Sequence, residues 1–116
     1  MSGFPKTKRL TCTAEFERVR QRGSKFRGGL ISLAVLCDNP GEKWRAGFIT
    51  SRKVGNAVAR NRVRRHLREI VRRHQNELID GIWIVMIASP RAASVASREL
   101  EAEWLRLAER ASILAA

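Results

Sequence analysis

The segment of residues 57–74 constrains the fold most, because its apolar side chains recur with the period of an α-helix. Ala59, Val63, Leu67, Ile70 and Val71 follow the spacing i, i+4, i+8, i+11, i+12. The other side of the same helix carries arginines, namely Arg62, Arg65, Arg68, Arg72 and Arg73. Such a helix packs with one face and presents positive charge with the other. It therefore needs a second layer of structure to cover its apolar face.

The positive charge is concentrated in the first two thirds of the chain. The whole sequence has 23 Lys and Arg against 11 Asp and Glu, a net charge of +12. Residues 1–74 hold 19 of these basic residues and 5 of the acidic ones. This excess predicts a polyanionic partner, with nucleic acid first and an acidic membrane surface second. Arginine favours phosphate, because its planar fork donates two hydrogen bonds at once.

The remaining patterns predict three strands and two further helices. The strands are expected at residues 30–37, 45–51 and 82–88, and the helices at 13–22 and 95–111. The order α-β-β-α-β-α favours an α+β two-layer sandwich with helices on one sheet face. Residues 1–116 are expected to form a single domain, with a basic arm at 1–10 and a flexible C-terminus at 112–116. A crossover between parallel strands would ordinarily be right-handed.

Several classes of protein are excluded by the sequence. Cys12 and Cys37 are too few for a disulfide framework and lack the spacing of a structural zinc site. No apolar run approaches the ~20 residues of a membrane span, and no N-terminal signal is seen, so a cytoplasmic location and reduced thiols are expected. His66 and His74 are expected to be surface or packing residues, because neither has an obvious metal partner. No motif of a catalytic site is found, so the protein is not expected to be a catalyst on its own.

The run Ser51 to Arg65 closely resembles the signature of the bacterial ribonuclease P protein family. Arg60-Asn61-Arg62 matches its RNR motif, and Lys53 to Val58 matches the sequence that precedes this motif in the family. Further landmarks follow in family order, including Pro5-Lys6, Glu15-Phe16 and Gly23. The resemblance implies a ribosomal protein S5 domain 2-like sandwich with a mixed sheet. It also implies a left-handed β-α-β crossover in place of the usual right-handed one.

The resemblance also implies a function. The family binds a large catalytic RNA, and the holoenzyme removes the 5′ leader from precursor tRNA. The RNA, with bound Mg²⁺, carries the chemistry, and the protein is an accessory subunit with no catalytic residue or metal ligand of its own. The residues implied to bind RNA are Arg52, Lys53, Asn56, Arg60, Asn61, Arg62, Arg64, Arg65 and Arg68.

In this family the single-stranded leader lies in a cleft between the first helix and the open sheet face. The corresponding residues here are Phe16, Arg20, Ala34 and Phe48. Arg20 and Ala34 stand where many members have aromatic residues, so the cleft is predicted to rely more on charge and less on stacking. Phe16 could instead be a core residue, and Trp44 could be either packed or an exposed stacking residue.

Three other functions compete with this interpretation. A structural RNA-binding protein, such as a small ribosomal protein, could share the sandwich. A DNA-binding regulator would need a helix-turn-helix partner, which the flanking strands do not provide. A membrane-surface helix would use an apolar stripe that packing on a sheet explains better.

Overall fold

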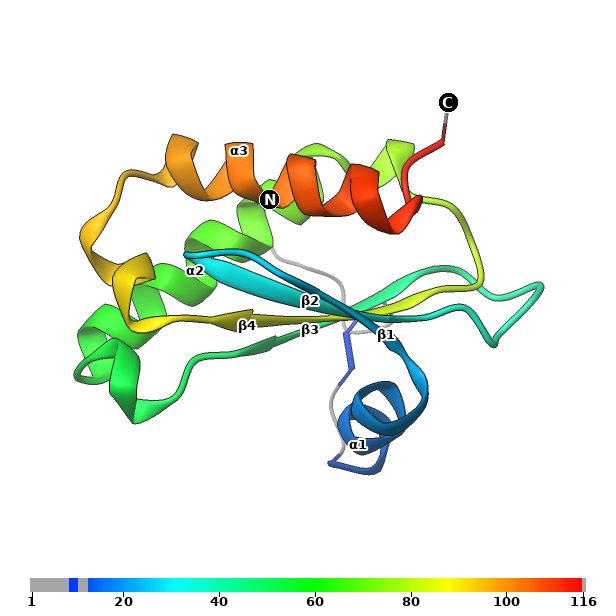
Figure 1. Ribbon diagram of the computed structural model, residues 1–116, viewed down its shortest axis with the longest axis horizontal. Helices are drawn as coiled ribbons and strands as arrows, with labels where there is room; N and C mark the ends of the chain where they lie inside the picture. The colour runs from blue at the N-terminus through cyan, green and yellow to red at the C-terminus, as the bar shows by residue number, and fades with distance from the viewer. Residues whose placement is uncertain (1–8, 11–12, 116) are drawn as a thin grey trace.

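The computed structural model describes residues 9, 10 and 13–115, and its centre is one mixed four-stranded sheet (Figure 1). The strands are β1 (Ser24–Arg27), β2 (Ile31–Leu36), β3 (Arg45–Ile49) and β4 (Trp83–Ala88). Their order in the sheet is β1-β2-β4-β3. β2 pairs antiparallel with both β1 and β4, whereas β3 and β4 are parallel.

Two long helices cover one face of the sheet, and one shorter helix lies on the other (Figure 1). The long helices are α2 (Ala57–Arg73) and α3 (Ser97–Ala111), and the shorter one is α1 (Thr13–Arg22). Short 3-10 turns, η2 (Arg52–Val54), η3 (Gln75–Glu77) and η4 (Pro90–Ser94), connect these elements. The predicted α+β sandwich is therefore confirmed, with α1 added on the opposite side.

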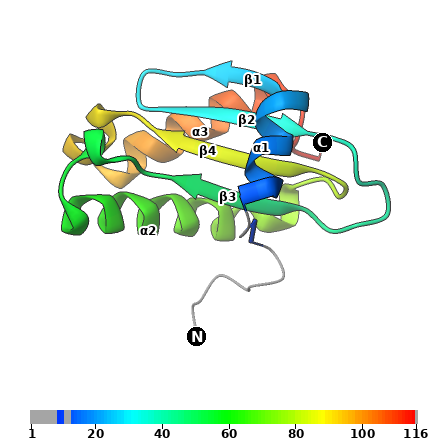
Figure 2. The same cartoon turned by 90° about the horizontal axis from the view of Figure 1, so that it is seen from below.

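The connection between the parallel strands passes through α2. Figure 2 views the sheet from the α1 side, where β3 and β4 both point leftwards and β4 lies above β3. In this view α2 lies behind the sheet, which makes the β3-α2-β4 crossover left-handed. The hand is the one that the family resemblance implied, not the one that the general rule favours.

The first strand, β1, is absent from the elements predicted by the sequence. Lys25 and Arg27 are exposed and Phe26 is half-buried, so the segment has little of the apolar character of the other strands. β1 is nevertheless an edge strand, in which charged residues are common because they discourage pairing with other chains. Its hairpin with β2 makes the order of the regular elements α-β-β-β-α-β-α.

The main core lies between the sheet and the two long helices. Ile31 and Leu33 of β2 and Ile84 and Met86 of β4 point into it. The helices contribute Val63, Leu67, Ile70 and Val71 from α2 and Leu100, Trp104 and Leu107 from α3. The apolar stripe predicted for residues 57–74 is therefore confirmed as the packed face of α2.

A smaller core lies under α1, on the other face of the sheet. It comprises Leu10, Val19, Ala34, Leu36, Trp83 and Val85. The alternation of side chains along the strands explains the division, because neighbouring residues of one strand face opposite layers.

Two expectations for the ends of the chain are wrong where the structure describes them. Ile113 is fully buried and accepts a hydrogen bond from Ile79 N at 3.0 Å, and Leu114 bridges to Leu78. Residues 112–115 are therefore anchored rather than flexible. At the other end, Leu10 N donates to Ala46 O at 3.0 Å and Leu10 is buried, so the basic arm does not extend through residue 10. Residues 1–8 and 116 lie outside the described part.

Candidate nucleic-acid interface

The start of α2 is fixed by the side chain of Asn56. Its Oδ1 accepts a hydrogen bond from Ala59 N at 2.9 Å, which is a typical N-cap. Gly55 has φ of 148°, a conformation that suits glycine and allows η2 to turn directly into α2. Asn56 was predicted to bind RNA, and the structure shows that its carbonyl oxygen already serves the helix.

Four basic side chains around this turn are not paired with any acid in the described chain. They are Arg52 and Lys53 of η2, and Arg60 and Arg65 of α2. Arg52, Lys53 and Arg65 are exposed, and Arg60 is half-buried at the border of the packed face. The N-terminal end of the helix dipole adds to their positive field. This surface is therefore suited to binding phosphate.

Three more predicted RNA-binding residues are tied to the protein itself. Arg64 donates to Asn61 Oδ1 at 3.0 Å and to Thr50 Oγ1 at 2.6 Å. Arg62 donates to the carbonyl oxygen of Ala93 in η4 at 2.6 Å. These bonds hold the guanidinium groups in place while leaving donors free, because arginine has five N–H groups. Sequence reasoning missed Thr50, which carries no pattern that marks it as a partner of a residue 14 positions later.

A hollow of about 260 Å³ opens beside β3 and is lined by three arginines. Arg9, Arg64 and Arg68 line it together with the rings of Phe16 and Phe48. The guanidinium of Arg68 lies 5.9 Å from the centroid of the Phe48 ring, a cation–π distance. Burial, together with the charges of Arg9 and Arg64, lowers the pKa of Arg68. An anion in this hollow would relieve that repulsion.

The predicted leader-cleft residues are not brought together. Ala34 is buried beneath α1, and Arg20 is exposed on α1, where it pairs with Glu17 at 3.6 Å. Phe48 packs against the main core, on the face opposite Ala34. The prediction of a single cleft lined by all four residues is therefore wrong. The sequence could not show this, because it fixes neither the register of the strands nor the position of α1.

Phe16 and Phe48 both line the hollow beside β3, although they pack against cores on opposite faces of the sheet. Gly47 directly precedes Phe48 in β3, and a Cβ at position 47 would come within 2.6 Å of the Phe16 ring. Glycine at position 47 thus leaves room for the Phe16 ring in its present position against β3. Phe16 is half-buried, so it contributes both to packing and to the wall of the hollow.

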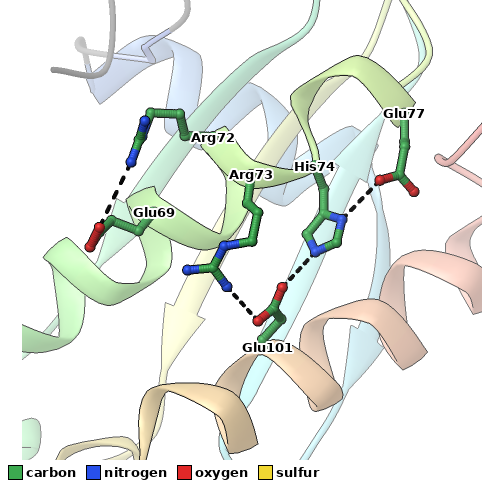
Figure 3. A network of polar contacts seen from close by, with 6 residues as sticks. All are labelled: Glu69, Arg72, Arg73, His74, Glu77 and Glu101. Atoms are coloured by element: carbon green, nitrogen blue, oxygen red, sulfur yellow. Dashed lines mark hydrogen bonds and ion pairs between the residues drawn. The ribbon is translucent and has the colours of Figure 1, made fainter. Parts of the chain in front are cut away.

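The C-terminal half of α2 differs, because acids there neutralise the basic side chains (Figure 3). Arg72 pairs with Glu69 at 3.9 Å, and Arg73 pairs with Glu101 of α3 at 2.5 Å. His74 Nε2 lies 2.6 Å from Glu101 and its Nδ1 lies 2.9 Å from Glu77. The last turn of α2 therefore carries less unneutralised positive charge than η2 and residues 60–65.

The pKa values of the two histidines of this region, His66 and His74, are shifted in opposite directions. Partial burial disfavours the charged ring of His74, but hydrogen bonds with Glu77 and Glu101 outweigh it and raise its pKa. Burial and the neighbouring charges of Arg65 and Arg62 lower the pKa of His66. His74 also stacks on Trp104 of α3, with ring centroids 5.7 Å apart. It is therefore a packing residue between α2 and α3, which is one of the two roles predicted for it.

The three tryptophans of the chain all serve packing. Trp44, Trp83 and Trp104 are all buried, so Trp44 is a packing residue and not an exposed stacking residue. The guanidinium groups of Arg18 and Arg45 lie 5.6 and 5.8 Å from the centroid of the Trp83 ring. Within residues 9, 10 and 13–115, no three His, Cys, Asp or Glu side chains gather to hold a metal ion. No helix in this part of the chain is long and apolar enough to cross a membrane.

Comparison with known proteins decides the family. The family model named Ribonuclease P matches residues 4–112. The chain belongs to the ribonuclease P protein family. A ribonuclease P protein component of Dehalococcoides mccartyi is 42% identical over 106 residues, which are 91% of this chain and 86% of that protein. One from Chloroflexus aggregans is 39% identical over 109 residues, 91% of this chain and 78% of the other.

Solved ribonuclease P proteins share the fold. The protein from Thermotoga maritima is 25% identical, with a TM-score of 0.79 over 88% of this chain and 96% of that one. The Staphylococcus aureus protein is 24% identical, with a TM-score of 0.84 over 92% of this chain and 97% of the other. The resemblance inferred from residues 51–65 is thus confirmed, and as a ribonuclease P protein component the chain functions in tRNA processing.

Proposed function

We propose that this chain binds the catalytic RNA of ribonuclease P through η2 and the N-terminal half of α2, and so assists removal of the 5′ leader from precursor tRNA. The observation that carries the proposal is the group of unpaired cations Arg52, Lys53, Arg60 and Arg65. Arg62 and Arg64, whose guanidinium groups are hydrogen-bonded within the protein, extend this surface on either side. Arginines held in this way bind phosphates without reading bases, which suits recognition of a folded RNA by its backbone.

The hollow beside β3 is the proposed site for the single-stranded leader. Arg64 and Arg68 would hold a leader phosphate, and the exposed part of the Phe16 ring would stack on a neighbouring base. Base–aromatic stacking contributes about 1–3 kcal/mol per base and does not depend strongly on sequence. Since Ala34 is buried and Arg20 is paired on the outer face of α1, the aromatic contribution falls to Phe16 and Phe48.

The division of labour in the holoenzyme follows from the types of residue at this surface. Arginine and lysine side chains bind phosphate and, as cations, repel Mg²⁺, whose protein ligands are mainly carboxylates. We therefore assign Mg²⁺ and the hydrolytic step to the RNA, and substrate affinity and positioning to the protein. The complex with catalytic RNA and precursor tRNA would act in the cytoplasm.

Precursor-tRNA cleavage at low Mg²⁺ tests this function. The assay compares the cognate catalytic RNA, the protein, and both together. Cleavage at the mature 5′ end only with both components is the expected result. Tight RNA binding without any gain in cleavage would favour a structural RNA-binding protein, and cleavage by the protein alone would contradict the assignment of the chemistry to RNA.

A further inference from the structure

Val58, in the first turn of α2, is unusually exposed for a large apolar residue. Its exposed fraction is 77%, and no other large hydrophobic side chain in the described part of the chain is exposed. Valine is not favoured at this helical position, because β-branched residues are weaker helix formers than alanine or arginine. Neither packing nor helix formation therefore accounts for it.

The position of Val58 relates it to the cationic surface. At about 100° per residue, Val58 lies opposite the buried Val63 and Leu67 and in the centre of the exposed face of α2. Asn61 and Arg62 follow it by three and four residues, so their Cβ atoms lie roughly 5–6 Å from that of Val58. Arg65 follows one turn later on the same face.

Any RNA that binds these cations must therefore cover Val58. The basic groups attract phosphate, but a valine side chain offers nothing to a phosphate or to water. It gains free energy only when apolar surface leaves water. In RNA, the groups that can cover it are the ribose and the face of a base that is not stacked on its neighbours.

We propose that Val58 packs against an unstacked nucleoside of the catalytic RNA, forming an apolar contact at the centre of the cationic interface. This inference rests on the proposed function. The contact adds affinity that does not depend on salt, whereas the surrounding arginines add affinity that does. It also requires that the RNA present a nucleoside, not a continuous duplex backbone, to the first turn of α2.

The test measures binding of the full-length protein to a fluorescently labelled transcript of the cognate catalytic RNA, over a series of KCl concentrations. Val58→Ala should weaken binding about threefold to tenfold at every concentration, because two buried carbon atoms are lost. The slope of log affinity against log salt should stay that of the wild-type protein. Val58→Ile, which keeps the apolar surface, should bind within about twofold of wild type.

Two comparisons make the result decisive. Alanine is the better helix former, so Val58→Ala keeps α2, and far-UV circular dichroism verifies this. Arg65→Ala, measured alongside, should lower the salt slope. Wild-type affinity of Val58→Ala, or an affinity loss with a lower slope, would overturn the inference while Arg65→Ala still supports the proposed function. No effect of either variant would overturn both.

Discussion

The guanidinium of Arg64 donates to Thr50 Oγ1 at 2.6 Å and thereby joins α2 to the end of β3. Thr50 is buried, and Arg64 also lines the hollow beside β3. The hydrogen bond thus fixes one of the three cations of the hollow. Its geometry links the stability of the protein to the shape of the proposed leader site.

Replacing Thr50 by valine should reduce both the stability of the protein and its affinity for the leader. Thr50→Val keeps the shape of the side chain but removes the acceptor, so the free energy of unfolding should fall by about 1 kcal/mol. Affinity for leader-bearing precursor tRNA should fall as well, because Arg64 is no longer held. Urea unfolding and a binding titration measure the two quantities. Thr50→Ser, which keeps the hydroxyl, is the matched control, and equal behaviour of both variants would show that the bond is unimportant.

Removing the unpaired arginines should reduce the salt dependence of RNA binding. Arg60→Ala and Arg65→Ala should each lower the slope of log affinity against log salt by about 0.7–0.9, the value for one phosphate contact. Arg72→Ala is the matched control, since Arg72 belongs to the same helix but pairs with Glu69. If Arg72→Ala changed the slope as much as Arg65→Ala, the binding surface would extend along the whole helix.

Phe16→Ala should discriminate between substrates. If the ring stacks on a leader base, affinity for the precursor should fall by about 1–3 kcal/mol, and affinity for mature tRNA should stay nearly constant. The two affinities are measured with the assembled holoenzyme. Because Phe16 also packs over Gly47, Phe16→Leu serves as a control that keeps apolar volume. Equal losses for both RNAs in a folded variant would assign Phe16 to the core alone.

His74 should stabilise the protein more at low pH than at high pH. Its pKa is raised in the folded protein, so its contribution is complete below the ordinary value of about 6.5 and is lost as the pH rises through the folded-state pKa. His74→Gln should therefore cost more free energy of unfolding at pH 6 than at pH 8.5.

His66 provides a control of opposite sign. Its pKa is lowered, so the folded protein loses stability as the pH falls through about 6.5. His66→Gln should therefore be more favourable, relative to wild type, at pH 6 than at pH 8.5. The same trend for both histidine variants would contradict the opposite environments shown by the structure.

The sequence predicts the helix that carries the interface better than it predicts the cleft. The apolar period of α2 depends only on neighbours along one helix, and Val63, Leu67, Ile70 and Val71 are all buried as expected. β1 is not predicted, because an edge strand does not need alternating apolar and polar residues. The cleft was misassigned because the facing of Ala34 and Phe48 depends on how strands and α1 assemble, which no local pattern records.

One contact of the fold also limits the substitutions that the turn between β1 and β2 can accept. The buried carboxylate of Glu103 accepts hydrogen bonds from Leu30 N at 2.7 Å and Ile31 N at 2.8 Å, and so joins α3 to the β1–β2 hairpin. A Cβ at Gly28 would lie 2.4 Å from the same carboxylate. The same Cβ would lie 2.8 Å from the backbone oxygen of Ile31, so a shorter residue 103 would not by itself make room for a side chain at position 28. Position 28 should consequently stay glycine during evolution even where residue 103 varies.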